Sequence, residues 1–337
     1  MDVTQERPPE PLWYRVQIER NAFKTLQRRT NRHGLVFFGV YLLGLAVFGF
    51  LTVSGTLPVW ARVVSFFLFA TVFGFCEPIL HETHHRTPFR STWLNESVHY
   101  VAGVLTFKEP IRDRWLHAAH HTYTSYPDID PEIFLEPPPQ MRYLFVDFFR
   151  LRYVLLWVMA TIRNAIGPDA LTRRFVPPVE YRKVKWSARA CLTVYVATIG
   201  CAIGFHTWWP ILLLFVARFV GAPLHSYLSM PQHAGLAMGV SDWRLNTRTI
   251  LMSPLNRLLF WNMGFHLEHH MNPIVPFHAL PQLHTAMKRD CPPAYRSTWA
   301  AWSEMVPALW RQRREPTYLV PRPLTSPIDT VKDPSTS

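Results

Sequence analysis

The chain has 337 residues, of which 49% are hydrophobic and only 17% are charged, and its net charge is +12. This hydrophobicity excludes a chain that is disordered over most of its length, and four cysteines without a CxxC pair exclude a disulfide scaffold. A basic chain can bind nucleic acid, but here the basic residues lie beside apolar segments, where such charges set membrane topology. We therefore expect a membrane protein that does not bind nucleic acid.

The chain begins with a polar, Arg-rich segment, residues 1–34. An apolar run at residues 35–53 follows, and its length is enough to cross a bilayer core of about 30 Å. An uncharged turn, residues 54–58, separates it from a second apolar run at residues 59–80. The two runs predict a transmembrane hairpin.

The next segment, residues 81–187, carries many charges. Its most apolar stretch, residues 143–162, is interrupted by Asp147, Arg150 and Arg152. A helix that lies in the membrane interface, with its charges at the headgroups, fits this pattern better than a span.

A second hairpin is predicted from apolar runs at residues 190–205 and 211–230, joined by a turn at residues 206–210. Arg218 lies within the last run. Because an isolated charge inside a membrane is costly, one face of this helix is expected to meet protein or a polar cavity.

Charge predicts the topology of the chain. The turns at 54–58 and 206–210 contain no Lys or Arg, whereas residues 1–34, 81–187 and 231–337 are rich in both. The positive-inside rule places those three segments in the cytoplasm. The sequence thus predicts an all-α membrane protein with four transmembrane helices in two hairpins, with a cytoplasmic helical cap and with both termini in the cytoplasm.

The cap is predicted to hold three histidine clusters. Nine of the sixteen histidines fall in the windows 81–85, 117–121 and 266–270. Residues at i, i+3 and i+4 share a helix face, so each window can direct two or three imidazoles at one point. Imidazole suits Fe, Zn, Cu and Ni. The first window begins where the second span ends and the third lies on the same predicted side, so the windows can converge, and His233 directly after the fourth span can join them.

The order of these windows and their flanking segments resemble the membrane-bound fatty acid desaturase and hydroxylase superfamily. The resemblance covers about residues 35–290 and includes the segments 120–132, 232–236 and 261–270. Among its members the chain looks most similar to bacterial ones, such as the rhizopine-catabolism oxygenases and the dihydrorhizobitoxine-type desaturases.

The resemblance implies two non-haem iron ions held by nine ligands: His81, His85, His117, His120, His121, His233, His266, His269 and His270. His84 falls outside this pattern, and its role is left open. Ligating histidines usually donate their second ring N–H to an acceptor. Four acidic residues are candidates for that role: Glu82, Asp128, Asp130 and Glu268.

The implied enzyme is an O₂-dependent di-iron oxidoreductase that acts on unactivated C–H bonds of a lipid or acyl chain, with fatty acid desaturation as the first expectation. Hydroxylation or oxidative decarboxylation, on a fatty acid or a small metabolite, is the alternative, because placement of the C–H bond decides among them. The sequence contains no His-Pro-Gly-Gly haem segment, no cysteine cluster and no dinucleotide fingerprint. A separate ferredoxin or cytochrome b5-like electron donor is therefore expected.

The implied organisation is a basic cytoplasmic segment (1–34), a desaturase-like membrane domain (35–290) and a Pro-rich cytoplasmic tail (291–337), which is expected to be disordered beyond about Pro316. The expected location is a bacterial inner membrane, which the chain crosses several times.

A different class of function also fits one window. The residues His81, Glu82 and His85 complete an HExxH motif, which would make the chain an intramembrane zinc metalloprotease with Glu82 as base. That function needs only one further ligand and leaves six clustered histidines unused. A haem-binding or metal-transport protein would carry ionisable residues within its spans, whereas these histidines lie beyond the span ends. The di-iron oxidation is preferred.

Overall fold

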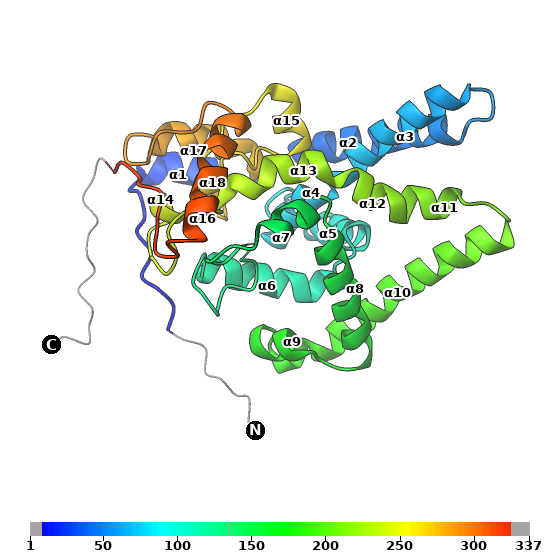
Figure 1. The fold of residues 1–337 in the computed structure, drawn as a ribbon, viewed down its shortest axis with the longest axis horizontal. Helices are drawn as coiled ribbons and strands as arrows, with labels where there is room; N and C mark the ends of the chain where they lie inside the picture. Colours follow the sequence, from blue (N-terminus) through cyan, green and yellow to red (C-terminus); the bar gives the residue numbers. More distant parts are fainter. Residues whose placement is uncertain (1–8, 134, 325–337) are drawn as a thin grey trace.

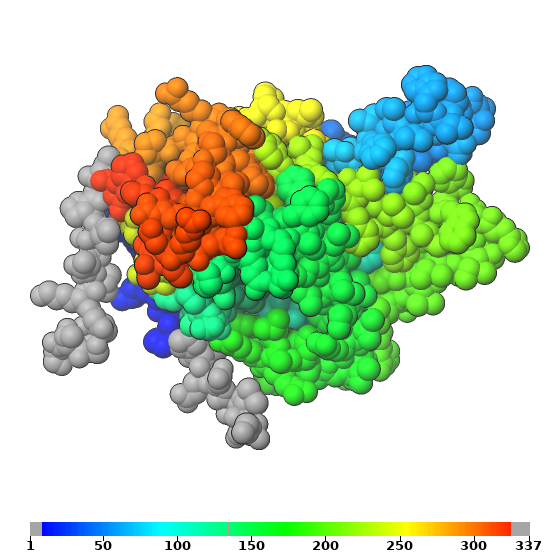
Figure 2. All heavy atoms as spheres, viewed as in Figure 1, coloured from blue at the N-terminus to red at the C-terminus, as the bar shows by residue number. Residues whose placement is uncertain are grey.

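The computed structural model describes residues 9–133 and 135–324. Within these ranges the chain is helical, and the only extended pairing consists of two isolated bridges, Thr249 with Phe265 and Ile250 with Tyr295. Two hairpins of long helices project from one side of a body built from shorter helices (Figure 1). The space-filling view shows the same division, with the two hairpins standing clear of the body (Figure 2).

The four predicted spans are confirmed as helices long and apolar enough to cross a membrane. They are Asn31–Val53, Val59–His84, Pro178–Gly204 and Trp209–Gln232. Their large apolar side chains are exposed along the outer faces, among them Leu43, Phe50, Trp60, Val196 and Ile203. Because water would not favour this exposure, these faces suit lipid.

Each span is built from one or more helices. The first hairpin contains α2 (Asn31–Val53), α3 (Val59–Gly74) and α4 (Cys76–His84). In the second hairpin α10 (Tyr181–Gly204) leads to α11 (Trp209–Ile211), a π-helical turn (Leu212–Val216), α12 (Ala217–Val220) and α13 (Ala222–Ser229). Helix α10 begins before the apolar run predicted at residue 190, because Pro177 and Pro178 are the nearest residues that interrupt a helix.

The two hairpins pack closely where α3 meets α12. A Cβ atom added at Gly221 would lie 1.6 Å from the carbonyl oxygen of Ala70, and one added at Gly74 would lie 2.4 Å from the carbonyl oxygen of Gly221. Only glycine allows backbones to approach this closely, as is common where membrane helices cross. This contact fixes the ends of α4 and α13 near each other.

The prediction for Arg218 is confirmed. Its side chain is fully buried and forms an ion pair with Glu77 of α4, and Lys108 lies 3.7 Å from the same carboxylate. The charge of the fourth span thus meets a partner from the second span, as a charge in a membrane interior requires.

The segment between the hairpins forms α5 (Thr92–Thr106), α6 (Pro110–Thr122), α7 (Met141–Phe148), α8 (Leu151–Ile166) and α9 (Ala170–Phe175). The interfacial helix predicted over residues 143–162 is therefore two helices. Arg150 breaks it, because this residue has a φ of 58° in the left-handed region. Buried Asp147 pairs with Arg152 across the break at 2.5 Å.

The last part of the chain forms α14 (Trp243–Asn246), α15 (Pro254–Leu259), α16 (His266–Met271), α17 (Leu280–Met287) and α18 (Thr298–Gln312). The N-terminal part, with α1 (Arg20–Leu26), lies against this region, where Trp13 stacks on Trp243 at 4.1 Å. The tail was expected to be disordered beyond about Pro316. Within the described part of this tail, Arg322 donates to the hydroxyl of Tyr295 at 2.6 Å and Val320 is buried; the residues after 324 lie outside the described ranges.

Candidate metal centre

The ends of several helices bring the predicted histidines together. The first window lies at the C-terminal end of α4, with His85 as the residue that follows the helix. The second lies in the last two turns of α6, and the third begins α16. His233 follows a short 3₁₀ turn after α13. All three windows are helical as predicted, so each directs its imidazoles from one helix face.

The nine histidines divide into two groups. The ring nitrogens of the first group lie within 4.8 Å of one another and belong to His81, His85, His117, His121 and His269. The second group contains His120, His233 and His270. His266 joins the second group, because its Nε2 atom lies 2.9 Å from that of His233 and 3.1 Å from that of His270. The division is therefore five and four, with no predicted ligand left out.

Acidic side chains lie close to the Nδ1 atoms of several of these rings. Both oxygens of Asp130 lie 2.9 Å from Nδ1 of His120, and they also accept hydrogen bonds from the backbone N–H groups of Ser125 and Glu132. Oε1 of Glu82 lies 3.4 Å from Nδ1 of His269, but these two buried atoms form no hydrogen bond. An acceptor at Nδ1 fixes the ring and leaves Nε2 free to bind a metal. Asp130 thus orients a ring as the sequence predicted, whereas Glu82 lies near a ring without bonding to it.

Glu132 is a partner that the sequence reasoning missed. Its carboxylate lies 3.2 Å from Nδ1 of His117. The sequence did offer a signal for Glu132. It lies two residues after Asp130 in the turn after α6, so both side chains can lie on the same side of that turn. His233 has a backbone partner instead, since its Nδ1 lies 2.9 Å from the carbonyl oxygen of Asn246.

Two of the predicted acids lie elsewhere. Asp128 is exposed at a φ of 63° and has no contact with a clustered histidine in the described part of the chain. Glu268 is fully buried, but it pairs with Nδ1 of His284 at 2.5 Å and accepts a hydrogen bond from Thr249. His284 is not one of the nine, so Glu268 supports the packing of α16 on α17.

His84 is separate from both groups. Its Nε2 atom lies 3.1 Å from Asp113, and its ring stacks on that of His117 at 4.6 Å. His84 therefore lines the back of the first group and points its nitrogen at a carboxylate.

Burial sets the protonation of the clustered rings. It lowers the pKa of His121, His269 and His270 well below the usual value, and repulsion among neighbouring imidazoles adds to the effect. Neutral imidazole is the form that binds a metal. His120 differs: burial opposes its charge, but Asp130 and Glu132 outweigh burial and raise its pKa to about 9.

The donor set fits a metal. Both ring nitrogens of His121 are buried and have no hydrogen-bond partner among the described residues. Such atoms are costly unless they bind something. A set made only of imidazole nitrogens suits iron, zinc, copper and nickel rather than magnesium or calcium. The His-rich cluster can therefore hold metal ions.

Comparison with known proteins identifies the family. Residues 58–302 match the family described as fatty acid desaturase, and this range contains all nine clustered histidines. The chain belongs to the fatty acid desaturase family. Together with the four apolar spans, this makes the desaturase-family chain a membrane protein.

A relative from Homo sapiens is described as a fatty acid desaturase 2-like protein. It is 22% identical over 222 residues, which are 59% of this chain and 45% of the relative. The chain thus spans less than half the length of that relative.

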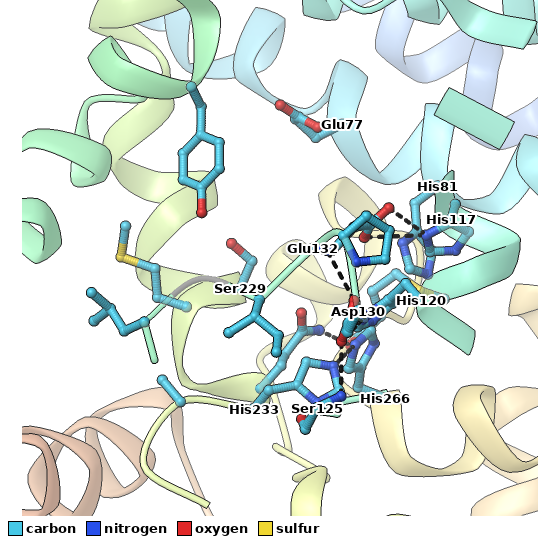
Figure 3. Close-up of a pocket in the computed structure, with 18 of the residues that line it drawn as sticks. Glu77, His81, His117, His120, Ser125, Asp130, Glu132, Ser229, His233 and His266 are labelled. Atoms are coloured by element: carbon cyan, nitrogen blue, oxygen red, sulfur yellow. Dashed lines mark hydrogen bonds and ion pairs between the residues drawn. The ribbon is translucent and has the colours of Figure 1, made fainter. Parts of the chain in front are cut away.

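A cavity of about 240 Å³ opens beside the histidines of this desaturase-family protein. Figure 3 shows His81, His117, His120, His233 and His266 at the right and lower parts of it, with Glu77 above them and Ser229 to their left. The wall also contains apolar side chains, among them Leu80, Leu135, Met238, Phe260 and Met263. A substrate in this cavity would lie directly against the histidine cluster.

Proposed function

We propose that this protein is an O₂-dependent di-iron oxidoreductase that removes hydrogen from unactivated C–H bonds of a lipid or acyl chain, and thus a fatty acid desaturase. One observation carries the proposal: nine buried or half-buried imidazoles divide into a group of five and a group of four beside one cavity. Two nitrogen-rich sites side by side suit a pair of metal ions. Family membership supports the oxidation chemistry.

In this proposal the group of five histidines holds one iron and the group of four holds the other. When bound, the irons supply the reduction of O₂ and the oxidation of the C–H bond. Asp130 and Glu132 hold the rings of His120 and His117 in place by accepting from Nδ1. The surrounding helices bury the site, which keeps bulk water from the reacting groups.

The cavity also serves the alternatives of hydroxylation and oxidative decarboxylation, since the position of the C–H bond decides the product. Product analysis by mass spectrometry separates the three reactions. A double bond removes two hydrogens from the substrate mass, hydroxylation adds one oxygen, and decarboxylation removes the carboxyl carbon with its two oxygens.

The contacts of Glu82 argue against the zinc protease. A base for hydrolysis must reach a water in the substrate cavity. Glu82 is fully buried outside the cavity wall, where one oxygen accepts from the hydroxyl of Thr87 and from the backbone N–H of Phe277. Its hydrogen bonds join the segments around Thr87 and Phe277 instead.

The proposal includes a separate electron donor, a ferredoxin or a cytochrome b5-like protein. We place both termini, the histidine cap and this donor in the cytoplasm, at the inner membrane of a bacterium. The net charge of +12 supports an acidic donor, because complementary charge speeds encounter.

The first experiment is to express the full chain with ample iron, purify it in mild detergent and measure iron and zinc per chain. We expect two irons. His120→Ala and His269→Ala, one from each group, are each expected to lose at least one iron and all activity with O₂ and a reduced ferredoxin. His206→Asn, in the exposed turn between α10 and α11, is the matched control and should keep both irons.

A single zinc without iron would overturn the proposal, as would full iron content in both alanine variants. Zinc competes well for such ligands. A preparation with two zincs is therefore stripped with a chelator and reloaded with ferrous iron under anaerobic conditions before the count is read.

A further inference from the structure

The end of the cavity beyond the histidines is lined by charged side chains. Glu77, Lys108, Asp113 and Arg150 all line it, and Arg218 lies behind Glu77. A cavity that holds only a hydrocarbon chain gains nothing from charges, because burying them without partners is costly. The partners of each charge therefore show what this end of the cavity can bind.

Every carboxylate in the wall has a partner. Glu77 is paired with Arg218 and lies 3.7 Å from Lys108. Lys108 also lies 3.2 Å from Asp113, which contacts His84 as well. The remaining two, Asp130 and Glu132, accept from the imidazoles of His120 and His117. No carboxylate of the described wall is left to bind a cation.

Arg150 differs from these residues, because it forms no ion pair with a described residue. The nearby Asp147 is taken by Arg152. The contacts of the Arg150 guanidinium are long ones: 3.4 Å to Nδ1 of His225, 3.3 Å to the hydroxyl of Ser229 and 5.7 Å to the centre of the Tyr153 ring. Its Nε–H is buried and has no hydrogen-bond partner in the described part of the chain.

The backbone at Arg150 adds to the positive potential. The residue stands at the start of α8, a helix of 16 residues with no acidic residue in its first turn and no side chain that caps it. A helix N-terminus attracts negative charge. Arg150 reaches this position in a left-handed conformation that non-glycine residues seldom adopt. Both Arg150 and Tyr153, in the first turn of α8, line the cavity.

We propose that Arg150, the hydroxyl of Ser229 and the N-terminus of α8 bind an anionic group of the substrate, a carboxylate or a phosphate, while the reacting carbon lies against the histidines. The substrate is then a small or short-chain anionic molecule whose charged end enters the cavity. The volume of about 240 Å³ agrees with this, since it lies below the ~300–1,000 Å³ of sites for drug-sized ligands. This inference rests on the proposed function for the reaction, but the anion site stands on its own contacts.

The test measures binding to the full chain in phosphatidylcholine nanodiscs by titration calorimetry. The probes are straight-chain carboxylic acids from butyrate to dodecanoate, the primary amides of the same chains, and the matching alkyl phosphates. At least one acid or phosphate should bind about tenfold or more tightly than its amide, a difference of about 1.4 kcal/mol. Comparison of the acid and phosphate series identifies which anion the site takes.

Arg150→Gln should remove the preference for the anion and leave binding of the amide unchanged. Arg163→Gln is the matched control, because it removes the same charge from an exposed position of the same helix, and it should bind like the wild type. If Arg150→Gln does not fold, Ser229→Ala tests the same site, and it should weaken binding of the anion several-fold without an effect on the amide.

Equal affinity for amides and anions throughout the series would overturn the anion site, as would an Arg150→Gln variant with wild-type affinity. Iron content is measured on the same samples. Two irons without anion preference would leave the oxidase intact and refute only the anion site. Anion binding that depends on Arg150 in a chain that takes up no iron would refute the oxidase instead.

Discussion

Asp130→Asn tests how the turn after α6 controls the metal centre. The carboxylate of Asp130 is nearly inaccessible to solvent, with 1% of its side chain exposed. Oδ2 accepts from the backbone N–H of Ser125 at 2.8 Å and Oδ1 from that of Glu132 at 2.9 Å, while both oxygens face Nδ1 of His120. An asparagine has one oxygen, so its NH₂ group must face one of these N–H donors in either orientation. The variant keeps the shape of the side chain and loses its function as a double acceptor.

The expected cost follows from the role of Asp130 behind a ligand. Loss of such a partner weakens metal binding about 10- to 100-fold, which corresponds to about 1.4–2.8 kcal/mol. One effect acts in the opposite direction. Because Asp130 helps to raise the pKa of His120 to about 9, the wild-type ring holds a proton that a metal must displace at neutral pH, and the variant reduces this competition. We expect the loss of orientation to dominate.

The assay is a competition for ferrous iron between the protein and a chelator of known affinity, followed by iron analysis of the protein. Asp128→Asn is the control, since Asp128 is exposed two residues away and asparagine tolerates its left-handed φ of 63°. It should retain wild-type affinity. Equal or tighter iron binding by Asp130→Asn would refute the reasoning, and so would an equal loss in both variants.

Three further variants test the packing and the ligand set. Gly221→Ala should destabilise the chain by at least ~1–3 kcal/mol, because its Cβ would overlap the α3 backbone. Gly200→Ala is the control and should leave the stability unchanged, because the space around Gly200 is open. Thermal unfolding measures both. Glu77→Gln should cost about 3–5 kcal/mol by leaving Arg218 unpaired, and adding Arg218→Met should restore most of the loss in the same assay. His84→Gln should keep two irons by elemental analysis, because His84 faces Asp113.

The histidine windows were predictable from sequence because their geometry is local. A spacing of three and four residues defines a helix face without knowledge of the rest of the fold. The hairpins were predictable for a similar reason, since a span is a property of about twenty consecutive residues. The Nε2 atoms of His81 and His269 are 188 positions apart in the sequence and lie 2.8 Å from each other in the structure. They meet because the helix faces of the windows and the ends of the spans both lie as predicted.

The acids behind the ligands could not be chosen from sequence. Asp128 and Asp130 are two residues apart, and only the left-handed turn at Asp128 decides that one side chain is exposed and the other meets His120. Glu268 lies inside the third window, but its position on α16 points it to His284. The hydrogen-bond partner of a side chain depends on its χ angles and on the position of a neighbouring helix. A local sequence pattern predicts neither.

The buried charges were equally hidden. Arg218 gave a signal because it lies in an apolar run, but its partner Glu77 is 141 residues away, and Lys108 lies in the loop before α6. Arg150 also appeared only as an interruption of an interfacial helix. That it borders the cavity beside the histidines depends on the break between α7 and α8, which the hydrophobic pattern does not predict.

The arrangement of the proposed ligands would couple a bound metal to the packing of the spans. His81 and His85 lie at the end of the first hairpin, His233 follows the second, and α6 and α16 supply the others. In the proposed assignment no iron is complete unless segments from distant parts of the chain are in place, so the free energy of metal binding also stabilises the fold. The Glu77–Arg218 pair and the contact at Gly221 join the same two hairpins and involve none of the nine histidines. These contacts hold the histidine-bearing ends of the hairpins together without help from the histidines themselves, which lowers the entropy that metal binding must overcome.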